Sequence, residues 1–119
     1  MTSFKKGDIF LAEIVFTDGT ATKRRPVAIV SGKSYNEKRD EVIVSLITSN
    51  VIRRIYGDIV IKNWASAGLL FPSAVTGIIT TIKKSLLEKK LGQLAIEDWL
   101  KVEDCMRKNL ELSDNRDKK

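Results

Sequence analysis

The sequence contains no histidine and a single cysteine, Cys105. Zinc sites are built mainly from histidine and cysteine ligands, and the triads of serine and cysteine hydrolases use histidine as the base. The sequence therefore excludes both classes of site. A single cysteine also excludes an internal disulfide, which agrees with a reducing compartment, and we expect Cys105 to be a small core residue.

Long apolar runs are absent as well, since none approaches the roughly 20 residues that span a bilayer, so we expect no membrane contact. The first ten residues lack the apolar segment and cleavage site of an export signal, and we place the chain in the cytoplasm. Acidic residues occur singly or in pairs without metal-binding spacing, and no glycine-rich loop of Walker or Rossmann type occurs. We therefore expect no metal and no cofactor.

The 119 residues suffice for one domain, residues 1–119, whose ends at 1–6 and 112–119 we expect to be flexible. The formal net charge of +6 favours an anionic partner, either nucleic acid or an acidic protein tail. The cations gather in four short clusters, Lys23-Arg24-Arg25, Arg53-Arg54, Lys83-Lys84 and Lys89-Lys90. The sequence does not show whether the fold brings these clusters onto one face.

Short apolar runs separated by turn-forming residues predict five or six strands, which form a compact bent sheet or small barrel. The expected strands lie within residues 7–16, 26–31, 42–49, 56–62 and 71–82. The first reads as buried on both faces, Pro26 can open the second, and Gly77 marks a bulge or bend in the last. Residues 17–23 are expected to form a loop and residues 32–41 a polar connection.

Helical signals come late in the chain. Ser85 and Glu88 fit a capping box and Gly92 fits a C-terminal cap, which together predict a short helix over 85–91. Apolar residues at helical spacing predict an amphipathic helix over 95–110 that packs on the barrel, with Trp99 in the core. The apolar positions are Ile96, Trp99, Leu100, Met106 and Leu110.

The remaining chemical inventory is a cationic cluster with hydroxyl side chains, centred on TKRRP at residues 22–26. This inventory suits RNA cleavage because RNA carries its own nucleophile, the 2′-hydroxyl. A protein that orients this group and stabilises the charged phosphate needs no metal. Arginine suits the stabilising role because its planar fork grips two phosphate oxygens, and a threonine or serine hydroxyl adds a hydrogen bond.

Five blocks in order resemble the MazF/PemK-type toxins of bacterial toxin–antitoxin systems, over about residues 7–110. They are GDIFLAEI, RRPVAIVS, VIVSLITSN, AGLLFPSAV and KKSLLEKKLGQL. The resemblance implies a mainly β fold with a C-terminal helix, a small SH3-like barrel as in MazF, PemK and CcdB. It also implies a homodimer that acts as a metal-independent endoribonuclease on a short sequence in single-stranded RNA and is neutralised by a cognate antitoxin.

The resemblance further assigns the site. The family's arginine before proline falls on Arg25, and its threonine at the end of the Ile-Thr-Ser strand falls on Thr48, so these are the expected catalytic residues. Products would be a 2′,3′-cyclic phosphate and a 5′-hydroxyl, and residues 17–23 match a loop that closes over RNA in relatives. The antitoxin is expected to lay an acidic or apolar tail over the same groove. The expected RNA-binding residues are Thr20, Lys23, Arg24, Ser49, Asn50 and Arg53.

The sequence departs from the family pattern in the groups that move protons. Some relatives carry an acidic residue on the strand after Pro-Ser, where this chain reads VTGIITT, and a histidine used by others has no counterpart. Arginine is always protonated and makes a poor base. Glu13 and Asp18 are the nearest candidates for proton transfer.

Several alternatives stay open. The chain could be a catalytically silent module on the same barrel that acts by protein contact, as topoisomerase-poisoning relatives do, or an inactive nucleic-acid-binding regulator. Arg25 could be a solvated turn residue and Thr48 an ordinary strand residue. Arg53 lies in a pair that either guides RNA or is solvated, and Trp64 could stack on a base or pack at a dimer seam.

The paired arginines predict their own division of roles. Adjacent residues in a strand point to opposite faces, so only one of Arg24 and Arg25 can point toward a given phosphate. Proline biases the residue before it toward an extended backbone, which reduces the freedom that Arg25 must lose to be positioned. We therefore expect Arg25 to act on the phosphate and Arg24 to guide RNA electrostatically.

Overall fold

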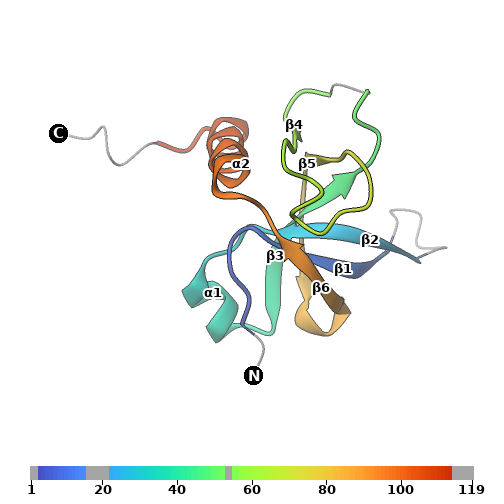
Figure 1. Cartoon of the computed structure of the whole chain (residues 1–119). Helices are drawn as coiled ribbons and strands as arrows, with labels where there is room; N and C mark the ends of the chain where they lie inside the picture. Colours follow the sequence, from blue (N-terminus) through green and yellow to red (C-terminus); the bar gives the residue numbers. More distant parts are fainter. Residues whose placement is uncertain (1–2, 16–21, 53–54, 114–119) are drawn as a thin grey trace.

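The computed structural model describes residues 3–15, 22–52 and 55–113 (Figure 1). Within these residues the chain forms six strands, two α-helices and one 3₁₀ turn. In chain order they are β1 (Asp8–Val15), β2 (Thr22–Ile29), α1 (Lys33–Lys38), β3 (Glu41–Thr48), β4 (Ile59–Val60), β5 (Ala74–Lys83), η1 (Lys84–Leu86), β6 (Leu87–Gln93) and α2 (Ile96–Asn109).

All six strands belong to one sheet in the order β4-β5-β3-β2-β1-β6, and every pair of neighbours is antiparallel. The sheet curls into a half-barrel, with α2 beside β4 and β5 and with α1 near the N-terminus (Figure 1). This architecture confirms the predicted fold class, a mainly β chain with a C-terminal helix. In the described part of the chain, no helix is long and apolar enough to cross a membrane.

Apolar side chains pack on both faces of the curled sheet. The first cluster contains Ile9 and lies under α2, which contributes Trp99 and Val102. The second cluster contains Phe10 and Val27 on the opposite face. Because successive residues of a strand point to opposite faces, β1 can supply both clusters only if both its faces are apolar, as its sequence predicted.

Strand β2 begins earlier than expected, at Thr22, so Pro26 lies inside the strand and does not open it. Proline is tolerated there because β3 pairs with β2 only from Val27 to Ile29, which leaves one edge of residues 22–26 open. On its other edge β2 pairs with β1 throughout, including Arg24 opposite Glu13. The three cations of TKRRP therefore lie on a strand and not in a turn.

The predicted irregularity at Gly77 is confirmed. In the ladder between β3 and β5, Ser45 pairs with Ile79 and Ile47 pairs with Val75, so three residues of β5 face one residue of β3. Gly77 is the middle one of these three. The bulge bends β5 at this point and contributes to the curl of the sheet.

The helix predicted over 85–91 is wrong, because this segment forms η1 and strand β6. Strand β6 pairs with β1, and this ladder outweighs the local capping signals. Two register shifts in the ladder disrupt the alternation of apolar residues that would have identified a strand. As a result, Leu87 packs against the second cluster and Leu91 against the first, although their spacing of four mimics a helix.

The connection over 32–41 also differs from the prediction, since it contains the one-and-a-half-turn helix α1. Its Asn36 is buried and donates through Nδ2 to the backbone oxygens of Phe4 and Ser31, at 2.9 and 3.0 Å. Phe4 packs its ring against Phe10 with centroids 5.3 Å apart. The expectation of a flexible end therefore does not extend to Phe4.

The C-terminal helix is confirmed as α2, and Trp99 lies in the core as predicted. The buried positions of α2 are Asp98, Trp99 and Val102, whereas Ile96 and Leu100 are exposed. The predicted apolar stripe therefore coincides only in part with the buried face of α2, since Trp99 lies on both whereas Ile96 and Leu100 face solvent. Cys105 is half-buried, with Sγ 3.4 Å from the backbone oxygen of Gly57.

Candidate nucleic-acid interface

A groove of about 640 Å³ lies beside the open edge of β2. The cations of its lining are Lys23, Arg24, Arg25 and Lys89, and its lining also includes Leu70 and Phe71. We call this feature the cationic groove. It brings the cluster of TKRRP together with part of the Lys89-Lys90 cluster, which lie more than 60 residues apart in the sequence.

Arg25 and Thr48 occupy corresponding positions on neighbouring strands. Val27 pairs with Leu46, and continuing that register by two residues places Arg25 of β2 opposite Thr48 of β3. On this register the two residues would share a face of the sheet, two positions beyond the last pair of the ladder. Arg25 is half-buried and its Nε atom is buried, which is unusual for a solvated turn residue.

Arg24 has a different environment from Arg25. Its Nε lies 2.9 Å from Oε1 of Glu88 on β6, and 71% of its side chain is exposed. Successive side chains of a strand point to opposite faces of the sheet, so those of Arg24 and Arg25 point in opposite directions. Both residues nevertheless line the cationic groove, because residues 22–26 form an open edge of the sheet there. The contrast in burial is consistent with two separate roles.

The other residues predicted for the site are only partly brought together. Lys23 and Ser49 line the cationic groove, but Asn50 lines a different hollow on the side of residues 55–60. Thr48 does not line the groove itself, and its hydroxyl accepts a hydrogen bond from the backbone N–H of Asn50 at 3.1 Å. The hydroxyl can still donate its own proton to a ligand. Thr20 and Arg53 lie outside the described residues.

The two candidates for proton transfer also differ in placement. Glu13 pairs in register with Arg24, on the face opposite Arg25, and its Oε2 accepts a hydrogen bond from the hydroxyl of Thr22 at 3.2 Å. Asp18 lies outside the described residues. Glu13 is therefore the cross-strand partner of Arg24, whereas Ala12 is the partner of Arg25.

One wall of the cationic groove is a loop over residues 61–73, which contributes several lining residues and is fixed by α2. The buried carboxylate of Asp98 accepts hydrogen bonds from the backbone N–H groups of Lys62 and Asn63, at 3.0 and 2.9 Å. Trp64 packs against the first core cluster from the same loop. These contacts hold the wall in place although the loop has no regular secondary structure.

The loop also makes a close backbone approach to β6. A Cβ atom added to Gly68 would lie 2.0 Å from the backbone oxygen of Leu91, and one added to Gly92 would lie 2.3 Å from that of Ala67. Gly68 has a φ of +90°, a conformation that favours glycine. The two glycines therefore let the wall of the groove and β6 come into direct contact.

The residues that line the groove without being predicted from the sequence include Lys89, Leu70 and Phe71. The sequence predicts a helix over 85–91, which gives no reason to place Lys89 in the site, whereas the pairing of Lys89 with Leu11 brings it into the groove. Leu70 and Phe71 are 84% and 62% exposed, which for such apolar side chains suggests a contact surface. Asp98 was missed too, since a carboxylate in the first turn of a helix ordinarily faces solvent.

Among the described residues, no group of three or more cysteine, aspartate or glutamate side chains is arranged to hold a metal ion. The cationic groove itself contains four cations and hydroxyl groups. Its chemistry is therefore that of an anion-binding site.

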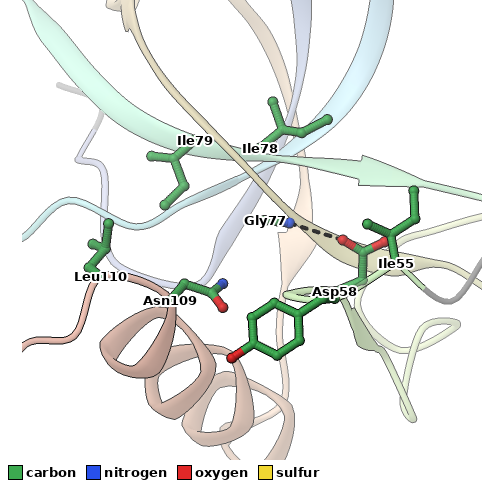
Figure 2. A pocket seen from close by; sticks show the side chains of 8 residues that line it. Ile55, Asp58, Gly77, Ile78, Ile79, Asn109 and Leu110 are labelled. Carbon is green, nitrogen blue, oxygen red and sulfur yellow. Dashed lines mark hydrogen bonds between the residues drawn. The ribbon is translucent and has the colours of Figure 1, made fainter.

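A second surface feature is apolar. Ile55 and Tyr56 of the β3–β4 connection lie near Ile78 of β5 and Leu110 at the end of α2, around a hollow of about 420 Å³. Figure 2 shows Asn109 and Leu110 at the end of α2 across from Ile78 and Ile79, with Asp58 bonded to the backbone N–H of Gly77. We call Ile55, Tyr56, Ile78 and Leu110 the apolar face, since more than half of each of these side chains is exposed.

The fold is shared with solved toxin structures. The chain is similar to the Mycobacterium tuberculosis toxin MazF-mt6, with 23% identity over 89% of this chain and 98% of that chain and a TM-score of 0.73. It is also similar to MazE-MazF (Form-II) from Deinococcus radiodurans, with 15% identity, coverage of 95% and 100%, and a TM-score of 0.77. At these identities the likeness shows the fold.

A third similar structure is an endoribonuclease in complex with its cognate antitoxin from a mycobacterial species, with 18% identity, coverage of 95% and 98%, and a TM-score of 0.74. A comparison with curated protein sequences finds no match.

The model of the family described as PemK-like, MazF-like toxins of type II toxin–antitoxin systems matches residues 5–110. This match spans both core clusters and the cationic groove, and it shows that the chain belongs to the PemK-like, MazF-like toxin family.

Proposed function

We propose that the chain is a metal-independent endoribonuclease toxin that acts in the cytoplasm and cleaves single-stranded RNA at a short sequence. The observation that carries the proposal is the cationic groove, which gathers Lys23, Arg24, Arg25 and Lys89 next to the end of β3. Four cations around one groove suit a phosphate backbone, and family membership supports a toxin that acts on RNA.

In the proposed reaction the 2′-hydroxyl oxygen of the RNA attacks the adjacent phosphorus. A P–O2′ bond forms, the P–O5′ bond breaks, and the proton lost by the 2′-hydroxyl is balanced by one gained at the leaving 5′-oxygen. The products are a 2′,3′-cyclic phosphate and a 5′-hydroxyl. No cofactor is consumed, so the protein has to orient the reactants and stabilise charge on the phosphate.

Arg25 is proposed to bind the nonbridging phosphate oxygens, where negative charge grows in the transition state. Thr48 is proposed to donate its hydroxyl proton to the same phosphate, since its oxygen already accepts from Asn50. Lys23 and Arg24 guide the backbone, and Ser49 contacts the RNA at the groove. Thr20, Asn50 and Arg53 are further proposed RNA contacts.

The same groove is proposed to bind the cognate antitoxin. A solved relative is an endoribonuclease in complex with its antitoxin. In this chain the cations could pair with acidic side chains, while Leu70 and Phe71 offer an exposed apolar surface in the same groove. An extended tail that carries both kinds of residue would cover the cations and so exclude RNA.

The nuclease proposal predicts that the purified protein cuts single-stranded RNA in excess EDTA and leaves single-stranded DNA of the same sequence intact, because DNA lacks the 2′-hydroxyl. Gel analysis and mass spectrometry of the fragments should detect cyclic phosphate and 5′-hydroxyl ends. Cleavage that stops in EDTA and returns with Mg²⁺ would contradict the mechanism. Intact RNA that is nevertheless bound would favour the nucleic-acid-binding regulator, and neither cleavage nor binding would favour the silent module.

We also propose that the protein is a homodimer that pairs through the apolar face. Large exposed apolar side chains gathered around one hollow commonly mark protein interfaces. Tyr56 is 88% exposed and Ile78 is 52% exposed, and the end of α2 adds Leu110 beside them. A second copy could cover these side chains from water.

For this dimer we expect Tyr56→Lys combined with Ile78→Lys to produce monomers, because association would bury two unpaired charges. Light scattering during size-exclusion chromatography should show half the mass of the wild-type particle. The matched control, Ile96→Lys with Leu100→Lys, changes two exposed apolar residues of α2 outside this hollow and should leave the mass unchanged. Equal loss of the dimer in both variants would contradict the placement of the interface.

A further inference from the structure

A second cationic hollow lies away from the groove, where the N-terminal segment meets α1 and η1. It has a volume of about 890 Å³, and its lining includes four lysines and one carboxylate, Glu37. The lysines are Lys5, Lys6, Lys33 and Lys84. We call this feature the lysine hollow, and the roles proposed above do not use it.

The lysine hollow is built from segments that are held in fixed positions. The buried Asn36 lines it and donates to the backbone oxygen of Phe4, and the ring of Phe4 packs on Phe10. The backbone N–H of Lys5 donates to the carboxylate of Asp8 at 3.0 Å, and Asp8 is itself buried. The backbone that carries Lys5 and Lys6 is therefore positioned before any ligand arrives.

The charges of the hollow are only partly compensated. Lys6 lies 3.8 Å from Glu103, and Lys84 lies 5.7 Å from the centre of the Phe4 ring, a cation–π contact. In the part of the chain that the structure describes, no ion pair within 4.0 Å involves Lys5, Lys33 or Lys84. Uncompensated like charges in one hollow repel each other, and an anion that binds there would relieve this repulsion.

The lysine hollow and the cationic groove lie toward opposite ends of β2. Arg24 is near the start of the strand, and Lys33 begins α1 four residues after the strand ends at Ile29. At about 3.3 Å per residue, the backbone between them spans at most about 30 Å. One extended polyanion can bridge two sites at this separation, whereas a single phosphate cannot.

The lining favours a nucleic acid over a protein tail. A protein partner gains much of its affinity from apolar anchors, which the cationic groove offers in Leu70 and Phe71. In the lysine hollow the one large apolar side chain of the lining, Phe4, is half-buried under Lys84. Lysine is a point charge that suits phosphates without reading sequence.

We propose that the lysine hollow is a second phosphate-binding site for single-stranded RNA, which holds the strand beyond the segment that is cleaved. The inference rests on the proposed nuclease function. It makes affinity depend on the length of the RNA, since only a strand that reaches both sites can use them together. It carries no sequence preference, because phosphates are the same in every nucleotide.

The test compares binding of 2′-O-methyl RNA, which lacks the nucleophile, at two lengths of about 4 and about 16 nucleotides. For Lys33→Gln with Lys84→Gln we expect about a tenfold loss of affinity for the longer strand and no change for the shorter one. The slope of log affinity against log salt should fall by about 1.4 for the longer strand, since each lost contact to a single strand contributes about 0.7. Fluorescence anisotropy measures both quantities.

The control, Lys101→Gln with Lys108→Gln, removes the same charge from the exposed surface of α2 and should leave both affinities within about twofold. Equal losses for the two variants, equal losses for the two lengths, or unchanged binding would each overturn the proposal. So would weaker antitoxin binding with RNA binding intact, since the hollow would then serve a protein. Cleavage of RNA by the wild type is scored separately, so failure of the nuclease function and failure of this second site remain distinguishable.

Discussion

Arg25→Ala is expected to lower the rate of RNA cleavage by about a thousandfold or more, because it removes the cation proposed to stabilise the phosphate in the transition state. Arg25→Lys should recover little of this loss, since a lysine cannot bind two phosphate oxygens as a planar fork does. Single-turnover cleavage at saturating enzyme isolates the chemical step from binding. Circular dichroism on the same samples confirms that the sheet remains folded.

Arg24→Ala is the matched control for Arg25→Ala, since it removes the same side chain one position earlier. Arg24 is exposed and already paired with Glu88, so its loss should weaken RNA binding by about two- to fivefold and leave the saturated rate nearly unchanged. The binding defect should shrink as salt rises. Equal and complete loss of cleavage in both variants would contradict the division of roles between the two arginines.

Gly68→Ala is expected to destabilise the protein by about 3 kcal/mol or more, the largest loss of stability that we anticipate from a single methyl group. The added Cβ would lie 2.0 Å from the backbone oxygen of Leu91, and the residue has a φ of +90°. The positive φ alone costs on the order of 1–2 kcal/mol, and the backbone of β6 cannot move aside without breaking its ladder with β1. Urea unfolding followed by fluorescence measures the difference.

Gly32→Ala serves as the control for Gly68→Ala. A Cβ at Gly32 would meet only Cε of Lys6, at 3.6 Å, and the backbone has an ordinary φ of −82°. We expect this variant to lose less than about 1 kcal/mol, the small preference for glycine over alanine at a helix N-cap. If both variants lost the same stability, the close approach of the loop and β6 would not explain the effect.

Much of this fold follows from local patterns. In residues 8–15 the side chains that point to either face of a strand are largely apolar, which predicts a strand with two buried faces. The structure confirms this, since Ile9 and Phe10 lie in different core clusters. The helical repeat over 95–110 predicts α2 because it needs only neighbours along the chain. Gly77 interrupts a β-rich run, and its lack of a side chain predicts a bulge there. Each of these features is decided within a few residues.

Other features depend on contacts between distant residues. Residues 85–91 carry a capping box and leucines at helical spacing, yet they form a strand because the β1 edge offers a ladder of hydrogen bonds. Local propensity differs among residues by less than about 1 kcal/mol, so a ladder with tertiary packing overrides it. The same ladder brings Lys89 into the cationic groove, which no local pattern could indicate.

The sequence alone determined which chemistry is excluded, which residues form the first strand and the last helix, and that Arg25 precedes a proline next to Arg24. The tertiary structure decided which of these residues meet. It gathered Arg25, Ser49 and the apolar side chains of Leu70 and Phe71 around one groove, and it placed Asn50 in another hollow. The physical reason is that side-chain chemistry belongs to each residue, whereas a groove forms only where the curl of the sheet and the anchoring of a loop bring separate segments together.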